Sequence, residues 1–202
     1  MTLGEVREDV ERSADSKNSK IPPSMSKADY MEMMVNRCLI EEDDFDMLVM
    51  GRTQGKGCYC FVNGLLQAQL QKLTPNYPYL VVDNEAGMEH ISRGILPKVD
   101  TIILVSDCSR RGVQAVGRIR DLIKECNLNP SSVGLIVNRA PQGVLNQGTQ
   151  EEIEKQGLTL LGVLPQDETV YEFDCEGKPT VELPADSPVR KALYDILDKL
   201  NL

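Results

Sequence analysis

The chain has 202 residues, of which 41% are hydrophobic and 26% charged, the balance of a globular protein large enough to bury a sizeable core. Its formal net charge of -9 argues against general nucleic-acid binding, because a polyanion would be repelled over most of the surface. No apolar run is long enough to cross a bilayer, and residues 1–20 lack the apolar centre of a signal peptide. We therefore expect a cytoplasmic protein that binds neither nucleic acid nor membrane.

The chain begins with a polar stretch rich in serine and charged residues, which predicts a partly mobile arm over residues 1–23. Helical spacing of apolar residues follows over 24–40, and a short strand is predicted over 46–51. No interior change in composition marks a second boundary. The sequence thus predicts a single α/β domain over residues 24–202.

Strands and helices then alternate along the rest of the chain. The predicted strands cover 79–82, 101–106, 133–137 and 158–164, and the predicted helices cover 113–126, 151–156 and a terminal segment that begins at Ser187. Several of these strands are continuously apolar, which is typical of strands covered by helices on both faces. The pattern predicts an internal parallel sheet flanked by helices.

The end of the strand over 79–82 carries a pattern typical of a nucleotide switch. Asp83 closes the strand, and Gly87 follows four positions later. In such a switch the aspartate orients water on Mg²⁺, and the glycine lets the backbone approach a terminal phosphate. The alternative is that Asp83 caps a helix or forms a turn, the commoner use of an aspartate at a strand end.

Polar residues also follow the next strands, in the region where open parallel sheets bind ligands. Asn138 comes directly after one strand, and Pro165, Gln166 and Asp167 come after the next. A carboxamide at a strand end can donate to a ring nitrogen of adenine and accept from its amino group. Loop capping is the alternative function of these residues.

A glycine-rich segment over residues 51–57 leads into two cysteines, Cys58 and Cys60. The segment is not a P-loop, because it lacks the glycine-lysine-serine/threonine ending. Two thiolates at this spacing can bind one metal ion but fill only half of a tetrahedral site. A symmetric homodimer would supply two more, and four thiolates suit Zn²⁺ or Ni²⁺. Buried structural cysteines are the alternative.

Three segments, in this order and spacing, resemble the CooC family of carbon monoxide dehydrogenase maturation factors. They are Leu48–Arg52, Gly57–Cys60 and Val81–His90. The family fold is a P-loop NTPase of the MinD and nitrogenase-iron-protein class. The resemblance implies an ATPase that uses ATP and ADP with Mg²⁺, forms a homodimer, and delivers nickel to carbon monoxide dehydrogenase or a related nickel enzyme.

The resemblance also implies roles for individual residues. Cys58 and Cys60 would be the ligands of Ni²⁺ or Zn²⁺, and Asp83 would be the catalytic switch aspartate near Mg²⁺. The residues implied in nucleotide binding all follow predicted strands and are Gly87 at the phosphate, Asn138 at the adenine, and Pro165 and Asp167 in the loop beside the base.

One family feature is not among these residues. Family members begin with a strand and a Gly-Lys-Gly-Gly-Val-Gly-Lys-Thr-type loop that holds the phosphates, so the resemblance predicts an N-terminally truncated fold with weak or no ATP hydrolysis by itself. Two alternatives remain open: a catalytically silent metal-binding dimer and a ParA-like positioning ATPase. The segment over 189–202 mixes acidic with basic residues, which is typical of a packing helix rather than a membrane anchor.

Overall fold

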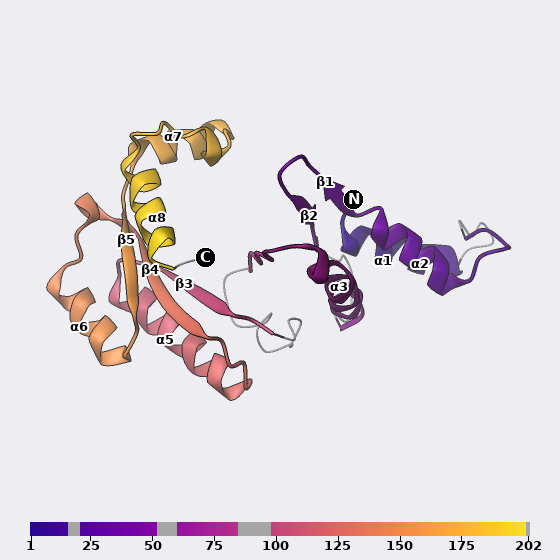
Figure 1. Ribbon diagram of the computed structural model, residues 1–202, viewed down its shortest axis with the longest axis horizontal. Helices are drawn as coiled ribbons and strands as arrows, with labels where there is room; N and C mark the ends of the chain where they lie inside the picture. Colours follow the sequence, from indigo (N-terminus) through magenta and orange to yellow (C-terminus); the bar gives the residue numbers. More distant parts are fainter. Residues whose placement is uncertain (16–20, 52–59, 85–97, 201–202) are drawn as a thin grey trace. The chain divides into compact units, whose positions relative to one another are not determined.

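The computed structural model describes residues 1–15, 21–51, 60–84 and 98–200 (Figure 1). Its contacts divide the chain into two compact units, Met1–Asn84 and Glu85–Leu202. We describe each unit by itself. The extent of the single domain predicted over residues 24–202 stays a prediction.

The first unit is mainly helical. Its elements are α1 (Leu3–Asp15), α2 (Lys27–Asn36), β1 (Leu39–Glu41), β2 (Asp46–Leu48), α3 (Cys60–Leu73) and the 3₁₀ turn η1 (Thr74–Asn76). Strands β1 and β2 pair antiparallel as a hairpin. The predicted helix over 24–40 and strand over 46–51 are therefore confirmed with shorter bounds.

Helix α1 lies where the sequence predicts a polar arm. Its Leu3, Val6 and Val10 are buried and belong to one apolar cluster with Met34 and Val35 of α2. These three residues recur at a spacing that puts them on one face of the helix, where Arg7 is also buried. The low average hydropathy of the segment hides this stripe, because a single apolar face needs only three such residues here.

The segment over residues 79–82 is not a strand, which corrects the sequence prediction. Its side chains are exposed, and that of Val81 is 89% exposed. A strand requires a neighbour that takes its backbone hydrogen bonds, and within the described ranges nothing pairs with this segment. Apolar composition alone therefore does not place it in a sheet.

The second unit contains the parallel sheet that the sequence predicts. Its elements are β3 (Thr101–Asp107), α5 (Arg110–Glu125), β4 (Ser132–Ala140), η2 (Pro141–Gly143), α6 (Gln147–Gln156), β5 (Leu160–Pro165), α7 (Glu168–Glu176), η3 (Thr180–Glu182) and α8 (Pro188–Lys199). The strands lie in the order β3-β4-β5, and both pairings are parallel. The fold class, a parallel sheet flanked by helices, is confirmed.

Helices cover the two faces of this sheet unequally. On one face, Leu135 and Val137 of β4 pack in a cluster with residues of α5 and α6. On the other, Ile136 packs against Ile196 of α8, which lies alongside β5 in Figure 1. Val105 of β3, next to Ile136 in register, is 59% exposed. The prediction of a fully internal sheet therefore holds for β4 and not for one face of β3.

A buried carboxylate joins α5 to α6. Glu152 is fully buried, and its oxygens accept hydrogen bonds from Nη2 of Arg110 at 3.1 Å and Nε2 of Gln156 at 2.8 Å. The hydroxyl of Thr149 donates to the carbonyl of Cys108 at 2.7 Å. A buried charge is tolerated when it is paired and hydrogen-bonded, as Glu152 is. This network fixes the start of α5 against α6.

We expect Gly162→Ala to destabilise the second unit by about 1–3 kcal/mol, the usual cost of overpacking a core. A methyl group at Gly162 would lie 2.4 Å from Cγ1 of Ile196, which is 1% exposed and has little room to move. Urea unfolding followed by circular dichroism measures the loss. The matched control is Gly148→Ala in α6, where the added methyl lies at an ordinary 3.4 Å from Asn146. Equal stability of Gly162→Ala and the parent would contradict the packing described.

We also expect the stability of this unit to fall in acid through Glu152. The hydrogen bond from Gln156, assisted by Arg110, lowers the pKa of Glu152 below its ordinary value of 4.5 despite burial. A carboxyl whose pKa is lower in the folded state stabilises the protein above its unfolded pKa, and this contribution disappears as pH falls through the folded pKa. Glu152→Gln should therefore lower stability at neutral pH and flatten its dependence on pH below 4.5.

The measurement is the free energy of unfolding at neutral pH and at several acidic pH values. Glu154→Gln serves as the control, because Glu154 is exposed on the same helix. If Glu152→Gln keeps the pH slope of the parent, Glu152 does not carry the acid sensitivity.

Candidate functional site

Three of the predicted nucleotide-binding residues lie together at the carboxyl ends of β4 and β5. Ala140 pairs in register with Pro165, and the backbone N–H of Gln166 donates to the carbonyl of Ala140 at 2.8 Å. Asn138 lies two residues before Ala140, and Asp167 lies two residues after Pro165. We call Asn138, Pro165, Gln166 and Asp167 the strand-end site.

Asn138 is half-buried and partly satisfied. Its Oδ1 accepts a hydrogen bond from the backbone N–H of Arg139 at 2.9 Å. Among the described residues, nothing accepts from its Nδ2, so the amino group is available as a donor. A carboxamide oxygen has two lone pairs, and one of them also remains available. The side chain can thus still present a donor and an acceptor together, as the sequence analysis requires for adenine.

The backbone adopts an uncommon conformation at the end of β4 and just after it. Arg139 has φ 58° and Gln142 has φ 56°, the left-handed region that non-glycine residues seldom enter. Such residues cost free energy and gather at binding sites, where the surrounding structure holds them in place. Sequence reasoning did not find them, because neither arginine nor glutamine is typical of this conformation.

Both carboxylate oxygens of Asp167 accept hydrogen bonds from other residues of the protein. Its Oδ1 accepts from the backbone N–H of Thr169 at 2.9 Å, which caps the start of α7. Its Oδ2 accepts from the hydroxyl of Ser187 at 3.0 Å. Loop capping, the alternative considered for this residue, is therefore present, and its role toward a nucleotide stays a prediction.

The end of β3 adds a carboxylate that the sequence analysis did not single out. Asp107 pairs in register with Asn138, and its Oδ1 accepts from the hydroxyl of Ser109 at 2.7 Å and from the Ser109 backbone N–H at 2.9 Å. These two bonds lower the pKa of Asp107. Gly112 approaches so closely that a Cβ there would lie 2.2 Å from Oδ1. The sequence signal that could have identified Asp107 is its place directly after the strand predicted over 101–106.

None of the other predicted site residues belongs to the described part of the second unit. Asp83 belongs to the first unit, where it is exposed and outside any strand. Cys60 is the first residue of α3. Cys58 and Gly87 lie outside the described residues. In the part of the chain that is described, no three His, Cys, Asp or Glu side chains gather as a metal site would require.

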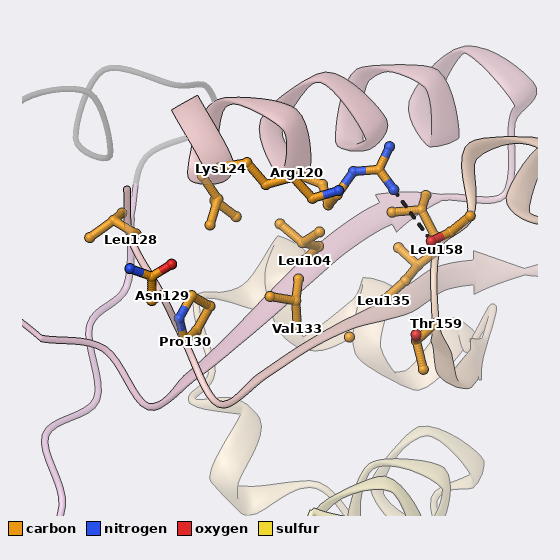
Figure 2. Close-up of a pocket in the computed structure, with 13 residues that line it drawn as sticks. Leu104, Arg120, Lys124, Leu128, Asn129, Pro130, Val133, Leu135, Leu158 and Thr159 are labelled. Atoms are coloured by element: carbon orange, nitrogen blue, oxygen red, sulfur yellow. Dashed lines mark hydrogen bonds between the residues drawn. The ribbon is translucent and has the colours of Figure 1, made fainter. Parts of the chain in front are cut away.

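A cavity of about 380 Å³ lies at the opposite ends of β4 and β5 (Figure 2). It opens between α5 and the sheet, with Leu104 and Val133 on its floor and Arg120 at its side. Nη1 of Arg120 donates to the carbonyls of Gln156 at 2.6 Å and Gly157 at 3.3 Å. None of the four residues of the strand-end site lines this cavity, so the two are separate.

Over the described ranges, no helix has both the length and the apolar character that crossing a bilayer demands.

No family model matches the sequence. The chain is 33% identical over 199 residues to an uncharacterised ATP-binding protein of Methanocaldococcus jannaschii, and the match covers 98% of this chain and 78% of that protein. It is 30% identical over 158 residues to a second uncharacterised ATP-binding protein of that organism, covering 75% of this chain and 58% of the relative. It is 27% identical to the carbon monoxide dehydrogenase accessory protein CooC of Rhodospirillum rubrum, covering 71% of this chain and 54% of CooC.

Solved structures of low sequence identity share the fold. A ParA family ATPase from Chlorobium tepidum has a TM-score of 0.67 at 18% identity, covering 98% of this chain and 74% of the other. The septum site-determining protein MinD of Pyrococcus horikoshii, complexed with Mg-ADP, has a TM-score of 0.64 at 16% identity, covering 100% and 73%. The predicted P-loop NTPase fold of the MinD class is thus confirmed. The 33% identity over 98% of this chain and 78% of the first Methanocaldococcus protein shows that the chain belongs to the same family as that ATP-binding protein, with the MinD/ParA-like P-loop fold.

Proposed function

We propose that this chain is the nucleotide-binding part of an ATP-dependent nickel-insertion factor. In this proposal the strand-end site binds the adenine of ATP or ADP, and Cys58 with Cys60 binds Ni²⁺ or Zn²⁺ in a homodimer. The relatives named as ATP-binding proteins support the first half, and the likeness to CooC supports the second. The recipient would be carbon monoxide dehydrogenase or a related nickel enzyme, in the cytoplasm.

The observation that carries the proposal is the geometry of Asn138. Its side chain lies at the carboxyl end of β4, beside the loop that β5 contributes, and keeps one donor and one acceptor available. This is the position at which open parallel sheets bind ligands. Adenine offers a ring nitrogen as an acceptor and an amino group as a donor, and a carboxamide matches both.

In the proposal, the residues of the switch pattern would contact the phosphates of the nucleotide and the Mg²⁺ ion. Asp83 would orient water on Mg²⁺, and the backbone at Gly87 would contact a terminal phosphate. The Mg-ADP complex of the MinD relative supports Mg²⁺ as the accompanying ion. Because no glycine-lysine-serine/threonine phosphate-binding loop occurs among the 202 residues, nucleotide binding rather than hydrolysis is the appropriate test.

The metal end rests on the C-x-C spacing of Cys58 and Cys60. Two thiolates from one chain can bind one metal ion, and two more from a second chain would complete a tetrahedral site. Nucleotide could control metal release only if metal binds the nucleotide states of the dimer with different affinities. A silent metal-binding dimer would bind metal in the same way without binding ATP.

We expect Asn138→Ala to weaken ATP binding by about five- to tenfold, roughly the value of one or two hydrogen bonds. Isothermal titration of the full chain with Mg-ATP measures the affinity. Asn129→Ala is the matched control, because Asn129 is an exposed asparagine that lines the cavity at the far end of the same sheet. Unchanged affinity in Asn138→Ala would remove this residue from the adenine site, and absence of ATP binding by the parent would leave the silent dimer as the better function.

We expect the reduced parent to change from monomer to dimer as Ni²⁺ or Zn²⁺ approaches one ion per two chains, since each chain would supply half of a tetrahedral site. Light scattering coupled to size-exclusion chromatography measures the mass. Cys58→Ser should abolish the change, whereas Cys175→Ser, which alters an exposed free cysteine of α7, should not. A mass that does not respond to metal in the parent would exclude the shared site.

A further inference from the structure

The terminal helix α8 begins at the strand-end site, and one hydroxyl connects the two. Ser187 is the N-cap of α8 and only 5% exposed. Its Oγ donates to Oδ2 of Asp167 at 3.0 Å and accepts from the backbone N–H of Arg190 at 3.3 Å. A serine hydroxyl has a single proton to donate, so the direction of both bonds is determined. Ser187 therefore caps α8 and holds Asp167 at the same time.

The loop that Asp167 ends is consequently held from three elements. The backbone N–H of Gln166 donates to Ala140 of β4, Oδ1 of Asp167 accepts from Thr169 of α7, and Oδ2 accepts from Ser187 of α8. Each carboxylate oxygen of Asp167 thus has a partner within the protein. The residue is engaged in holding the loop, and the backbone of Pro165 and Gln166 is what the loop presents beside Asn138.

The start of α8 is itself well fixed, which makes Ser187 a firm point of attachment. Nη1 of Arg190 donates to the carbonyl of Leu183 at 2.7 Å, and Leu183 is buried. Farther along α8, Ile196 is buried against Ile136 and Leu164 of the sheet. The hydrogen bond between Ser187 and Asp167 therefore ties the loop to a helix that is packed on the sheet.

We propose that Ser187 is a positioning residue for adenine selectivity, acting through Asp167 on the Pro165–Gln166 loop; this rests on the proposed function. Adenine presents an amino donor where guanine presents an oxygen acceptor, so a site with fixed polar groups suits one base and leaves groups unpaired with the other. Such discrimination requires that the groups cannot move to adapt. The Ser187–Asp167 bond supplies that constraint on the loop.

The test is the ratio of ATP to GTP affinity, measured by titration of the full chain with each nucleotide in Mg²⁺. Both ligands carry the same ribose and triphosphate, so the ratio isolates the base and does not respond to a uniform loss of binding. Ser187→Ala should lower the ratio by about fivefold, the value of one hydrogen bond. Ser187→Thr keeps the hydroxyl and should restore it. Asp167→Ala should give the same loss as Ser187→Ala, and the double variant should lose no more than either, because the two residues act as one unit.

Several outcomes would overturn the inference. If Ser187→Ala lowers the unfolding temperature and leaves the ratio unchanged, Ser187 is only a helix cap. If Asp167→Ala lowers the ratio and Ser187→Ala does not, Asp167 contacts the base directly. Should Ser187→Ala fail to fold, Ser187→Gly replaces it: glycine is tolerated at a helix N-cap but has no hydroxyl to donate to Asp167, so an unchanged ratio there also contradicts the role. A parent that binds neither nucleotide refutes the proposed function itself, and this is seen before any variant is made.

Discussion

The second unit depends on the complete burial of strand β4. Its run Gly134–Val137 is buried on both faces, and β3 and β5 take the hydrogen bonds of its two edges. A strand in this position can carry only apolar or very small side chains, and its parallel neighbours require helical crossovers. Helices α5 and α6 are these crossovers and cover one face of the sheet, while the terminal helix α8 covers the other. The close packing of Ile196 over Gly162 shows how little space the arrangement leaves.

Because the middle of the strands is buried, the polar side chains that could bind a ligand lie at the carboxyl ends of the strands. Asp107 is the last residue of β3, Asn138 lies two residues before the end of β4, and Asp167 lies two residues after the end of β5. Most of their oxygens accept bonds from nearby backbone or hydroxyl groups, which fixes the side chains in place. A site assembled from such held groups can discriminate between ligands because it does not rearrange. The amino group of Asn138 is the donor that this arrangement leaves available toward a ligand.

The proposed function divides between the two units. The residues proposed to bind adenine belong to the second unit, whereas Asp83, Cys58 and Cys60 belong to the first. Nucleotide-controlled metal transfer therefore demands communication along the chain and across the proposed dimer, with the metal bound differently in each nucleotide state. The MinD/ParA-like fold would bind the nucleotide in this proposal, and the two cysteines of the C-x-C pair would bind the metal ion.

The amino-acid sequence by itself determined the parallel sheet of the second unit, because its apolar runs alternate with amphipathic helices and local pattern decides such elements. The start of the last helix at Ser187 was predicted for the same reason, since helix capping is a contact between residues three apart. The sequence did not indicate that α1 carries a buried stripe, or that residues 79–82 lack a pairing neighbour, because both depend on what packs against them. The bond between Ser187 and Asp167 joins residues 20 positions apart and exists only once α8 has packed on the sheet. Its partners could therefore be named from the sequence one by one, while their connection required the fold.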